Sequence, residues 1–155
     1  MEELALHILD IARNSIEAGA AKIEIRVRES AREDLISFSV LDNGPGLERD
    51  LLTKITDPFY TTKNKKKKVG LGLALLKAAA EWCDGSFQIQ TGPGQGTKVT
   101  AAFRHGHIDR APLGDLPGTI TVLLTEPALA DLVYSHEVDG KRFFFSLQSL
   151  KDKCG

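Results

Sequence analysis

The sequence predicts an α/β protein, a two-layer sandwich in which helices cover one face of a mixed or antiparallel sheet, with a short β-rich extension at the C-terminus. Three observations predict it. One stretch has apolar residues at helical spacing, several stretches alternate apolar and polar residues, and the order of elements is not a run of strand-helix-strand units. The 155 residues, of which 42% are hydrophobic and 26% charged, suffice for one domain with a sizeable core.

The first third of the chain predicts a helix followed by two strands. Apolar residues recur every three or four positions over residues 4–16, and Gly19 ends this helix as a glycine after a last turn does. Residues 23–27 and 36–40 each alternate apolar with other residues, which predicts strands with one dry face. The apolar positions are Leu4, Ile8, Ile11, Ala12 and Ile16 in the helix, and Ile23, Ile25, Val27, Ile36, Phe38 and Val40 in the strands.

The middle of the chain predicts two helices around a loop and then two more strands. A turn-forming run ends the second strand, a short helix is expected over residues 48–55, and a loop over residues 56–69. A helix rich in Ala, Leu and Lys is expected over residues 73–83. The next two strands are marked by Phe87 and Ile89 and by Val99, Ala101 and Phe103, with Gly92-Pro93-Gly94 as the hairpin between them.

The last third predicts a linker and a small additional block. We divide the chain into a main domain at residues 1–104, a linker at residues 105–118, and an extension at residues 119–155 that packs on the main domain or on a partner. Residues 119–125 and 133–138 resemble strands. Asp139-Gly140 is expected to turn the second of these into a further strand over residues 141–147.

Composition excludes some classes of partner. The formal net charge is −1, so no global field favours nucleic acid or an anionic membrane. No apolar run approaches the length of a membrane span, and the first residues have no basic stretch followed by an apolar block, so we expect an unexported protein. The two cysteines, Cys83 and Cys154, lack metal-ligand spacing and fit a reducing compartment. We expect a cytoplasmic protein without a membrane or nucleic-acid partner.

Three segments carry candidate chemistry. Asp42-Asn43-Gly44-Pro45-Gly46 places a carboxylate at the end of a strand beside two glycines, so a ligand can approach the backbone next to a hydrogen-bond acceptor that suits an adenine amino group. Gly70-Leu71-Gly72-Leu73 opens a helix whose free amides favour phosphate. Asp10 and Asn14 lie one turn apart on the first helix, where their oxygens can hold a hydrated Mg ion. Each segment alone also suits a plain turn, a helix start or a solvated face.

Five motifs in fixed order make the set specific. They are Asp10–Ala20 (DIARNSIEAGA), Asp42–Gly46 (DNGPG), Asp57–Lys63 (DPFYTTK), Gly70–Leu73 (GLGL) and Gly94–Thr97 (GQGT). This set resembles the Bergerat-fold (GHKL) ATPases, the class of gyrase, heat-shock chaperones, histidine kinases and the mismatch-repair protein MutL. The first motif is similar to that of MutL, and the later ones resemble the catalytic domain of histidine kinases more closely.

The resemblance implies an Mg-ATP site and a role for each matching residue. Asn14 is expected to bind Mg and the phosphates, and Asp42 to accept the adenine amino hydrogen, with Gly44 and Gly46 lining the base pocket. The other implied nucleotide contacts are Thr97 in the water network around the adenine, Phe59 and Thr62 in the lid, Lys63 at the triphosphate, and the amides of Gly70, Leu71, Gly72 and Leu73 at the phosphates.

Two departures from the family pattern bear on turnover. Asp10 stands where hydrolysing members carry a glutamate as general base, and its side chain is one methylene shorter, so slow hydrolysis or none is expected. Kinase lids often read Gly-Thr-Gly-Leu-Gly-Leu, and Lys68 and Val69 stand here in place of the first glycine and the threonine. The lysine run at residues 65–68 is either a solvated loop or a source of countercharge for the triphosphate.

These features lead to a stand-alone histidine kinase-like ATPase that phosphorylates a partner protein in trans or signals through its nucleotide state, with Asp10, Asn14 and Lys63 as catalytic candidates. The alternative is a nucleotide-gated interaction switch, similar to anti-sigma-factor proteins, with little or no turnover and a client held by the C-terminal extension. A gyrase- or MutL-like clamp is disfavoured because the region after residue 104 is short for a transducer domain.

Overall fold

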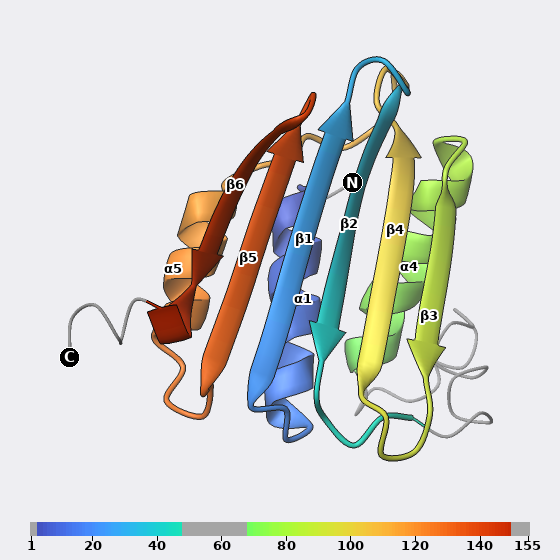
Figure 1. The fold of residues 1–155 in the computed structure, drawn as a ribbon. Helices are drawn as coiled ribbons and strands as arrows, with labels where there is room; N and C mark the ends of the chain where they lie inside the picture. The colour runs from blue at the N-terminus through green and yellow to red at the C-terminus, as the bar shows by residue number, and fades with distance from the viewer. Residues whose placement is uncertain (1–2, 48–67, 150–155) are drawn as a thin grey trace.

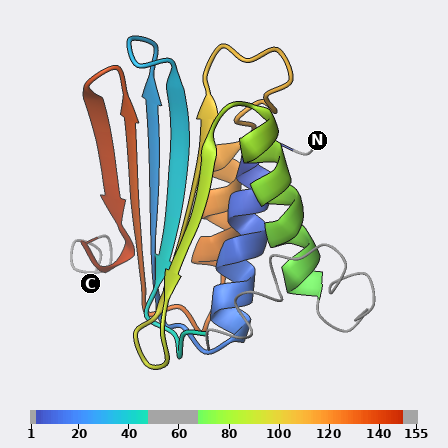
Figure 2. The ribbon, with the colours of Figure 1, turned by 90° about the vertical axis from the view of Figure 1, so that its right-hand side faces the viewer.

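The computed structural model describes residues 3–47 and 68–149, and for residues 68–72 it describes the backbone alone. These residues form two layers, a six-stranded sheet with helices on one of its faces (Figures 1 and 2). The helices are α1 (Leu4–Glu17), α4 (Lys68–Trp82) and α5 (Leu116–Leu124), and the strands are β1 (Lys22–Ser30), β2 (Leu35–Asp42), β3 (Ser86–Thr91), β4 (Thr97–Arg104), β5 (Asp131–Val138) and β6 (Lys141–Ser146). The predicted α/β sandwich is confirmed.

The sheet is mixed, in the order β3-β4-β2-β1-β5-β6. Only β1 and β5 pair in parallel; the other neighbours are antiparallel. Ile25 in β1 pairs with Val40 in β2 and with Tyr134 in β5, so these three side chains face the helix layer together. Because side chains alternate along a strand, Ile23 and Val27 face the same way, and the core lies between the sheet and the helices.

The start of α1 is capped by the chain that follows β4. No side chain caps this helix, and its first amides instead donate to backbone carbonyls. Leu4 N donates to Pro112 O at 3.0 Å and Ala5 N to Leu113 O at 2.8 Å. Free N–H groups at a helix start need partners when they are buried, and both Leu4 and Ala5 are buried. Residues 112–113 therefore stabilise the helix that carries Asn14.

The end of α1 is the glycine stop that the sequence predicts. Gly19 has a φ of 109°, which only glycine adopts without strain. Gly19 N donates to Ile16 O at 3.0 Å, and Ala20 N to Ser15 O at 3.0 Å. This pair of bonds is the Schellman arrangement, which satisfies the last carbonyls of the helix and turns the chain toward β1.

Helix α4 starts earlier than predicted. It begins at Lys68 instead of Leu73, so Gly70 and Gly72 lie in its first turns. The helix predicted over residues 48–55 and most of the loop predicted over residues 56–69 lie outside the described residues.

The C-terminal extension contains one error of prediction. Residues 119–125 were expected as a strand, but residues 116–124 form α5. Asp115 caps this helix, with its carboxylate accepting from Gly118 N at 2.9 Å, and Pro117 occupies the first turn, where a proline costs no hydrogen bond. The following hairpin of β5 and β6 is confirmed, and Asp139 and Gly140 have φ values of 48° and 88° in its turn.

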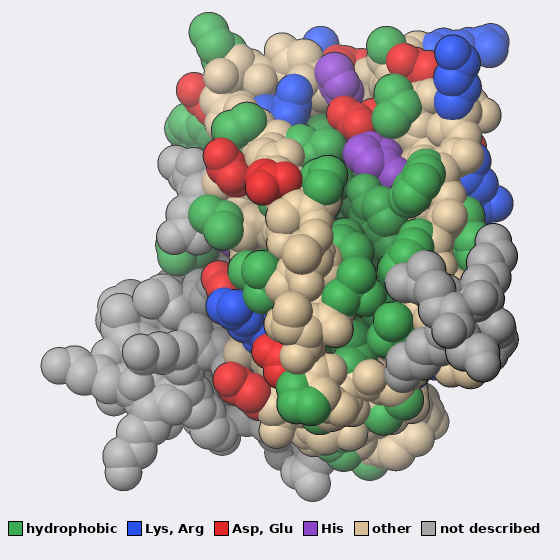
Figure 3. Space-filling view, turned by 90° about the vertical axis from the view of Figure 1, so that its left-hand side faces the viewer, with side chains coloured by type: hydrophobic (Ala, Val, Ile, Leu, Met, Phe, Trp, Pro, Cys, Tyr) green, Lys and Arg blue, Asp and Glu red, His purple; other side chains and the backbone are tan. Residues whose placement is uncertain are grey.

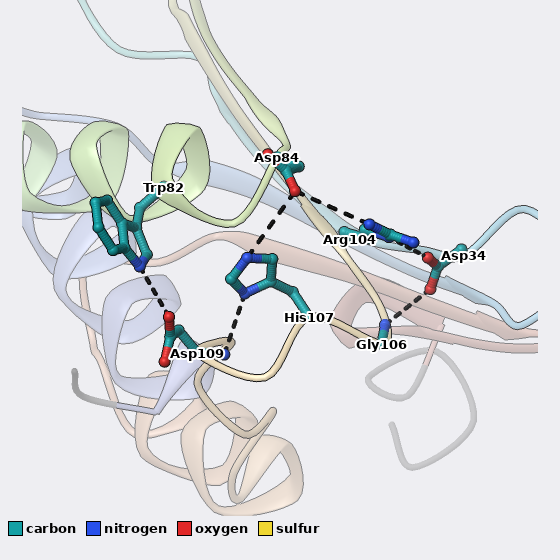
Figure 4. Close-up of polar contacts among 7 residues, drawn as sticks. All are labelled: Asp34, Trp82, Asp84, Arg104, Gly106, His107 and Asp109. Carbon is teal, nitrogen blue, oxygen red and sulfur yellow. Dashed lines mark hydrogen bonds and ion pairs between the residues drawn. The ribbon is translucent and has the colours of Figure 1, made fainter.

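Polar contacts fix the segment after β4 at one end of the sheet (Figure 4). Arg104 Nε contacts Asp34 Oδ2 at 2.6 Å, and Gly106 N donates to Asp34 Oδ1 at 2.8 Å. Both hydrogen bonds lower the pKa of Asp34, the one from Arg104 more than the one from Gly106. Trp82 Nε1 donates to Asp109 Oδ2 at 3.0 Å, which ties the end of α4 to the same segment.

The division of the chain at residues 104 and 118 stays a prediction, although the structure describes one continuous sheet on both sides of it. β5 pairs along the whole of β1, and α5 contacts α1. In the described part of the chain, no helix is long and apolar enough to cross a membrane.

Tyr134 gives a prediction for the pH dependence of stability. Burial, with a further contribution from Glu29, raises the pKa of Tyr134 to about 12. The unfolded chain releases this proton near pH 10 and the folded chain does not, so stability should fall as the pH rises from 10 to 12, by roughly 2–3 kcal/mol. In a Tyr60→Phe variant, which leaves Tyr134 as the one tyrosine, the phenolate absorbance should titrate near pH 12. A midpoint near pH 10 would contradict the burial.

Candidate functional site

Asp42 stands at the end of β2 with both carboxylate oxygens engaged. Oδ2 accepts from the Ser15 hydroxyl at 2.7 Å, and Oδ1 accepts from Gly44 N at 2.8 Å. A carboxylate has about four acceptor positions, so these two bonds leave room for a ligand N–H. They also fix the orientation of the group before any ligand arrives, as recognition of one particular donor requires.

Ser15 ties the helix that carries Asn14 to this carboxylate. Its one hydroxyl hydrogen can go to Asp42 at 2.7 Å or to Ile11 O at 3.1 Å, and the shorter, charge-assisted bond is the stronger. Asn14 is the preceding residue and is half-buried, whereas Asp10 lies one turn earlier and is exposed. Of the predicted pair, Asn14 therefore adjoins in sequence the serine that contacts Asp42, and Asp10 lies one turn earlier at the surface.

Glycines let two backbone segments approach each other beside Asp42. A Cβ on Gly96 would lie 2.2 Å from Asp42 O, and a Cβ on Gly46 would lie 2.0 Å from Gly92 O. Both glycines also have positive φ, at 72° and 76°. The connection is closed by Gly94 N, which donates to Pro45 O at 2.7 Å. The DNGPG and GPGQGT segments thus pack backbone to backbone, because glycine leaves no side chain between them.

Thr97 and Asp42 are direct neighbours across β4 and β2. Thr97 in turn pairs with Thr91 on β3, and their hydroxyl oxygens lie 3.0 Å apart. Thr91 Oγ1 also contacts Gly96 O at 2.9 Å and accepts from Leu47 N at 2.9 Å. A row of polar side chains therefore crosses three strand ends on the helix side of the sheet.

The first turns of α4 lie at the same end of the sheet (Figure 2). Leu73 is buried and packs with Val99, and Ile11 and Leu47 pack against the pair. This cluster holds α4 against α1 and the strand ends, so the three predicted segments meet in one region. Since α4 begins at Lys68, its first turn includes the amides before Gly70.

A cavity of about 570 Å³ opens at these strand ends. This size is typical of small-ligand sites, about 300–1,000 Å³. Its walls combine polar groups with apolar side chains. The lining residues are Leu41, Asp42, Leu47, Ile89, Gln90, Thr91, Gly92, Pro93, Gln95, Thr97 and Lys98. Of the residues predicted for the base pocket, Asp42 and Thr97 line this cavity, whereas Gly44 donates to Asp42 and Gly46 packs against Gly92.

Some of the predicted nucleotide-contacting residues are described only in their backbone or not at all. Phe59, Thr62 and Lys63 lie outside the described residues. For Gly70, Leu71 and Gly72 the backbone position in α4 is known, and their contact with phosphate stays a prediction.

Sequence reasoning missed three polar residues that organise the site. Ser15 and Thr91 have no sequence signal beyond their places next to Asn14 and before the Gly92-Pro93-Gly94 hairpin. Asn43 lies within the DNGPG motif, and its Oδ1 accepts from Ala21 N and Lys22 N, each at 2.9 Å. It fixes the end of β2 against the start of β1.

The fold and the sequence both match known proteins. The family of histidine kinase-, DNA gyrase B- and HSP90-like ATPases matches residues 2–107. The chain is similar to the sensor kinase CckA of Brucella abortus, at 34% identity over 128 residues, which are 74% of this chain and 13% of that protein. It is 39% identical over 93 residues to the sensor protein kinase FleS of Pseudomonas aeruginosa, covering 60% of this chain and 23% of that protein.

A solved structure supports the fold. The N-terminal domain of a DNA repair protein superposes with a TM-score of 0.62 at 16% identity, covering 93% of this chain and 52% of that chain. The present chain spans less than a quarter of the length of the two sensor kinases and about half of the repair protein chain. The motifs, the convergent geometry and these matches agree. The chain therefore belongs to the family of histidine kinase-, DNA gyrase B- and HSP90-like ATPases, as an ATP-binding domain of the histidine kinase type.

Proposed function

We propose that this chain binds Mg-ATP beside Asp42 and acts in trans, as a kinase for a partner protein or as a signalling ATPase. The observation that carries the proposal is the pre-oriented Asp42 carboxylate, which is held by Ser15 and Gly44 N and lines a cavity of about 570 Å³. A carboxylate with free acceptor positions in a cavity of mixed polar and apolar lining suits the amino group of a purine.

The residues present fit both ends of the nucleotide. Asp42, Gly46 and Thr97 would surround the base, and the start of α4 would face the phosphates, since a helix N-terminus favours anions. Asn14 would hold Mg through its amide oxygen. Mg takes few protein ligands and completes its octahedron with phosphate oxygens and water, and it neutralises charge on the phosphates.

Asp10 is the proposed point of control over hydrolysis. It is exposed on α1, one turn before Asn14, and its carboxylate is one methylene shorter than a glutamate. A base must come within hydrogen-bond reach of its water, and general-base catalysis contributes about 10²–10⁴-fold. We expect Asp10→Glu to raise steady-state ATP turnover at least roughly tenfold, with unchanged ATP affinity, and Asp10→Asn to lower turnover. Equal turnover in all three proteins would remove Asp10 from the reaction.

Transfer of labelled phosphate tests the kinase proposal. ATP labelled at the γ-phosphate is incubated with the protein alone and with each protein encoded next to it. Label is expected on one partner, and Asp42→Asn should abolish transfer at low ATP concentration. Release of labelled phosphate without transfer would leave a signalling ATPase. No label on any partner and no release would exclude both forms of the proposal.

A nucleotide-gated switch is the second candidate. The observation that favours it is that the chain beyond residue 107, where the family match ends, adds α5, β5 and β6 to the fold. A partner retained by the immobilised protein only with ATP, without turnover, would favour this function over the kinase.

A further inference from the structure

β6 is the outermost strand on one side of the sheet among the described residues, and its edge is apolar. Phe143 and Phe144 are 59% and 60% exposed. The opposite edge strand, β3, instead exposes Ser86, Gln88 and Gln90. An edge strand offers a row of unpaired N–H and C=O groups, and proteins usually protect it with charge, proline or a bulge. The centre of β6 carries three consecutive phenylalanines and no such protection.

A groove follows this edge on the helix side of the sheet. Its volume is about 600 Å³. Leu116 and Pro117 at the start of α5 form one wall, and Tyr134, Val138 and Phe143 form the other. The rings of Tyr134 and Phe143 have centroids 6.0 Å apart. Figure 3 shows hydrophobic side chains gathered in a hollow on this side of the molecule.

An extended strand beside β6 would satisfy both features. Its backbone would pair with the open edge, and every second side chain would enter the groove under α5. β6 itself has this pattern. Phe145 pairs with Tyr134, so Phe145 and Phe143 face the helix side, while Phe144 faces away from it. We propose that β6 of a second copy of this chain adds antiparallel to β6 across a two-fold axis, which joins the two sheets into one.

The register follows from the alternation of side chains. The helices of both copies lie on the same face of the joined sheet only if directly opposed residues are both odd-numbered or both even-numbered. Centring the axis on Phe144 pairs Phe144 with its own copy and Phe143 with Phe145 of the second copy. Arg142 then lies opposite Ser146 of the second copy, and the five paired residues all belong to β6. Each phenylalanine thus meets a phenylalanine, and aromatic cross-strand pairs are favourable.

Charge placement also favours this pairing. Lys141 and Arg142 lie at the start of β6, and an antiparallel pair places the two basic ends at opposite ends of the interface. Each basic end then faces the end of the neighbouring β6, beside which Asp131 is held by Gln148 N at 3.0 Å. The two basic ends are thereby kept apart.

Sedimentation equilibrium tests the interface, and it does not depend on nucleotide binding. The wild type is expected to be a dimer, and Phe144→Asp a monomer, because a carboxylate would oppose its own copy at the axis. Ile108→Asp is the matched control, since Ile108 is 94% exposed and lies outside β6 and the groove. It should remain a dimer. The circular dichroism spectra of both variants should match that of the wild type, because neither residue is buried and neither change should alter the fold.

Cross-linking tests the register. In a Cys154→Ser background, Phe144→Cys should form a disulfide-linked dimer on mild oxidation, since directly opposed residues have Cα atoms about 4.5–5.5 Å apart, within the range that a disulfide spans. Cys83 is buried and is not expected to react. Gln88→Cys, on the other edge strand, should stay monomeric on a denaturing gel. A monomeric wild type at every concentration, or equal cross-linking of Gln88→Cys and Phe144→Cys, would overturn the proposal.

Discussion

Asp42→Asn is expected to weaken the binding of Mg-ATP by about 1–3 kcal/mol, or roughly 5- to 150-fold, in calorimetry. In the wild type, Oδ1 of Asp42 accepts from Gly44 N and Oδ2 accepts from the Ser15 hydroxyl. The acceptor positions that remain for a ligand are on a charged carboxylate. An asparagine has one acceptor oxygen, which Gly44 N would engage. Its NH₂ would then face the ligand amino group, donor against donor.

The control for this result is Asp84→Asn. Asp84 follows the far end of α4 and has a φ of 55°, a conformation that asparagine also tolerates. The affinity of the Asp84→Asn variant for ATP should match that of the wild type. Ser15→Ala should weaken binding less than Asp42→Asn, and the effects should not add in the double variant, because both act on one carboxylate. Unchanged affinity in Asp42→Asn would place the base elsewhere.

Gly96→Ala is expected to destabilise the protein more than Gly94→Ala. Both glycines have nearly the same φ, at 72° and 73°, so each alanine has a similar conformational cost of about 1–2 kcal/mol. A Cβ on Gly94 meets nothing within 4 Å, whereas one on Gly96 would lie 2.2 Å from Asp42 O. That overlap with a strand end should cost about 1–3 kcal/mol more.

Urea unfolding measures this difference directly. Subtracting the result for Gly94→Ala from that for Gly96→Ala removes the backbone preference and leaves the contact with Asp42 O. Gly96→Ala should also weaken ATP binding, because the Asp42 backbone must move. Equal unfolding free energies for the two variants would show that the strand end yields without cost.

Local sequence patterns predicted those elements whose structure depends on residues close by in the chain. Ile23, Ile25 and Val27 face the core as their alternation requires, and Gly19 ends α1. The prediction of a strand over residues 119–125 was wrong. It rested on the β-branched residues of this segment and not on Asp115 and Pro117, which are typical of the start of a helix. The parallel pairing of β5 with β1 spans more than a hundred residues, and no local pattern encodes it.

The sequence predicts which residues gather at the candidate site, but not the residues that position them. Asp42 is predicted from the glycines that follow it, and Thr97 from the resemblance of the GQGT motif to the family. The Ser15 hydroxyl acts through a contact 27 residues away, which exists only once α1 packs against β2. Thr91 likewise acquires its partners only when β3 pairs with β4.

The capping of α1 by Pro112 and Leu113 sets a lower limit on the length of a fragment that can fold. Truncation at residue 107, where the family match ends, would strip the first amides of α1 of their acceptors and leave the β1 edge without β5. It would also uncover the apolar side chains that α5 shields. Proteolysis between Arg104 and Leu116 should therefore release no stable nucleotide-binding core, and the smallest autonomous unit should extend through β5.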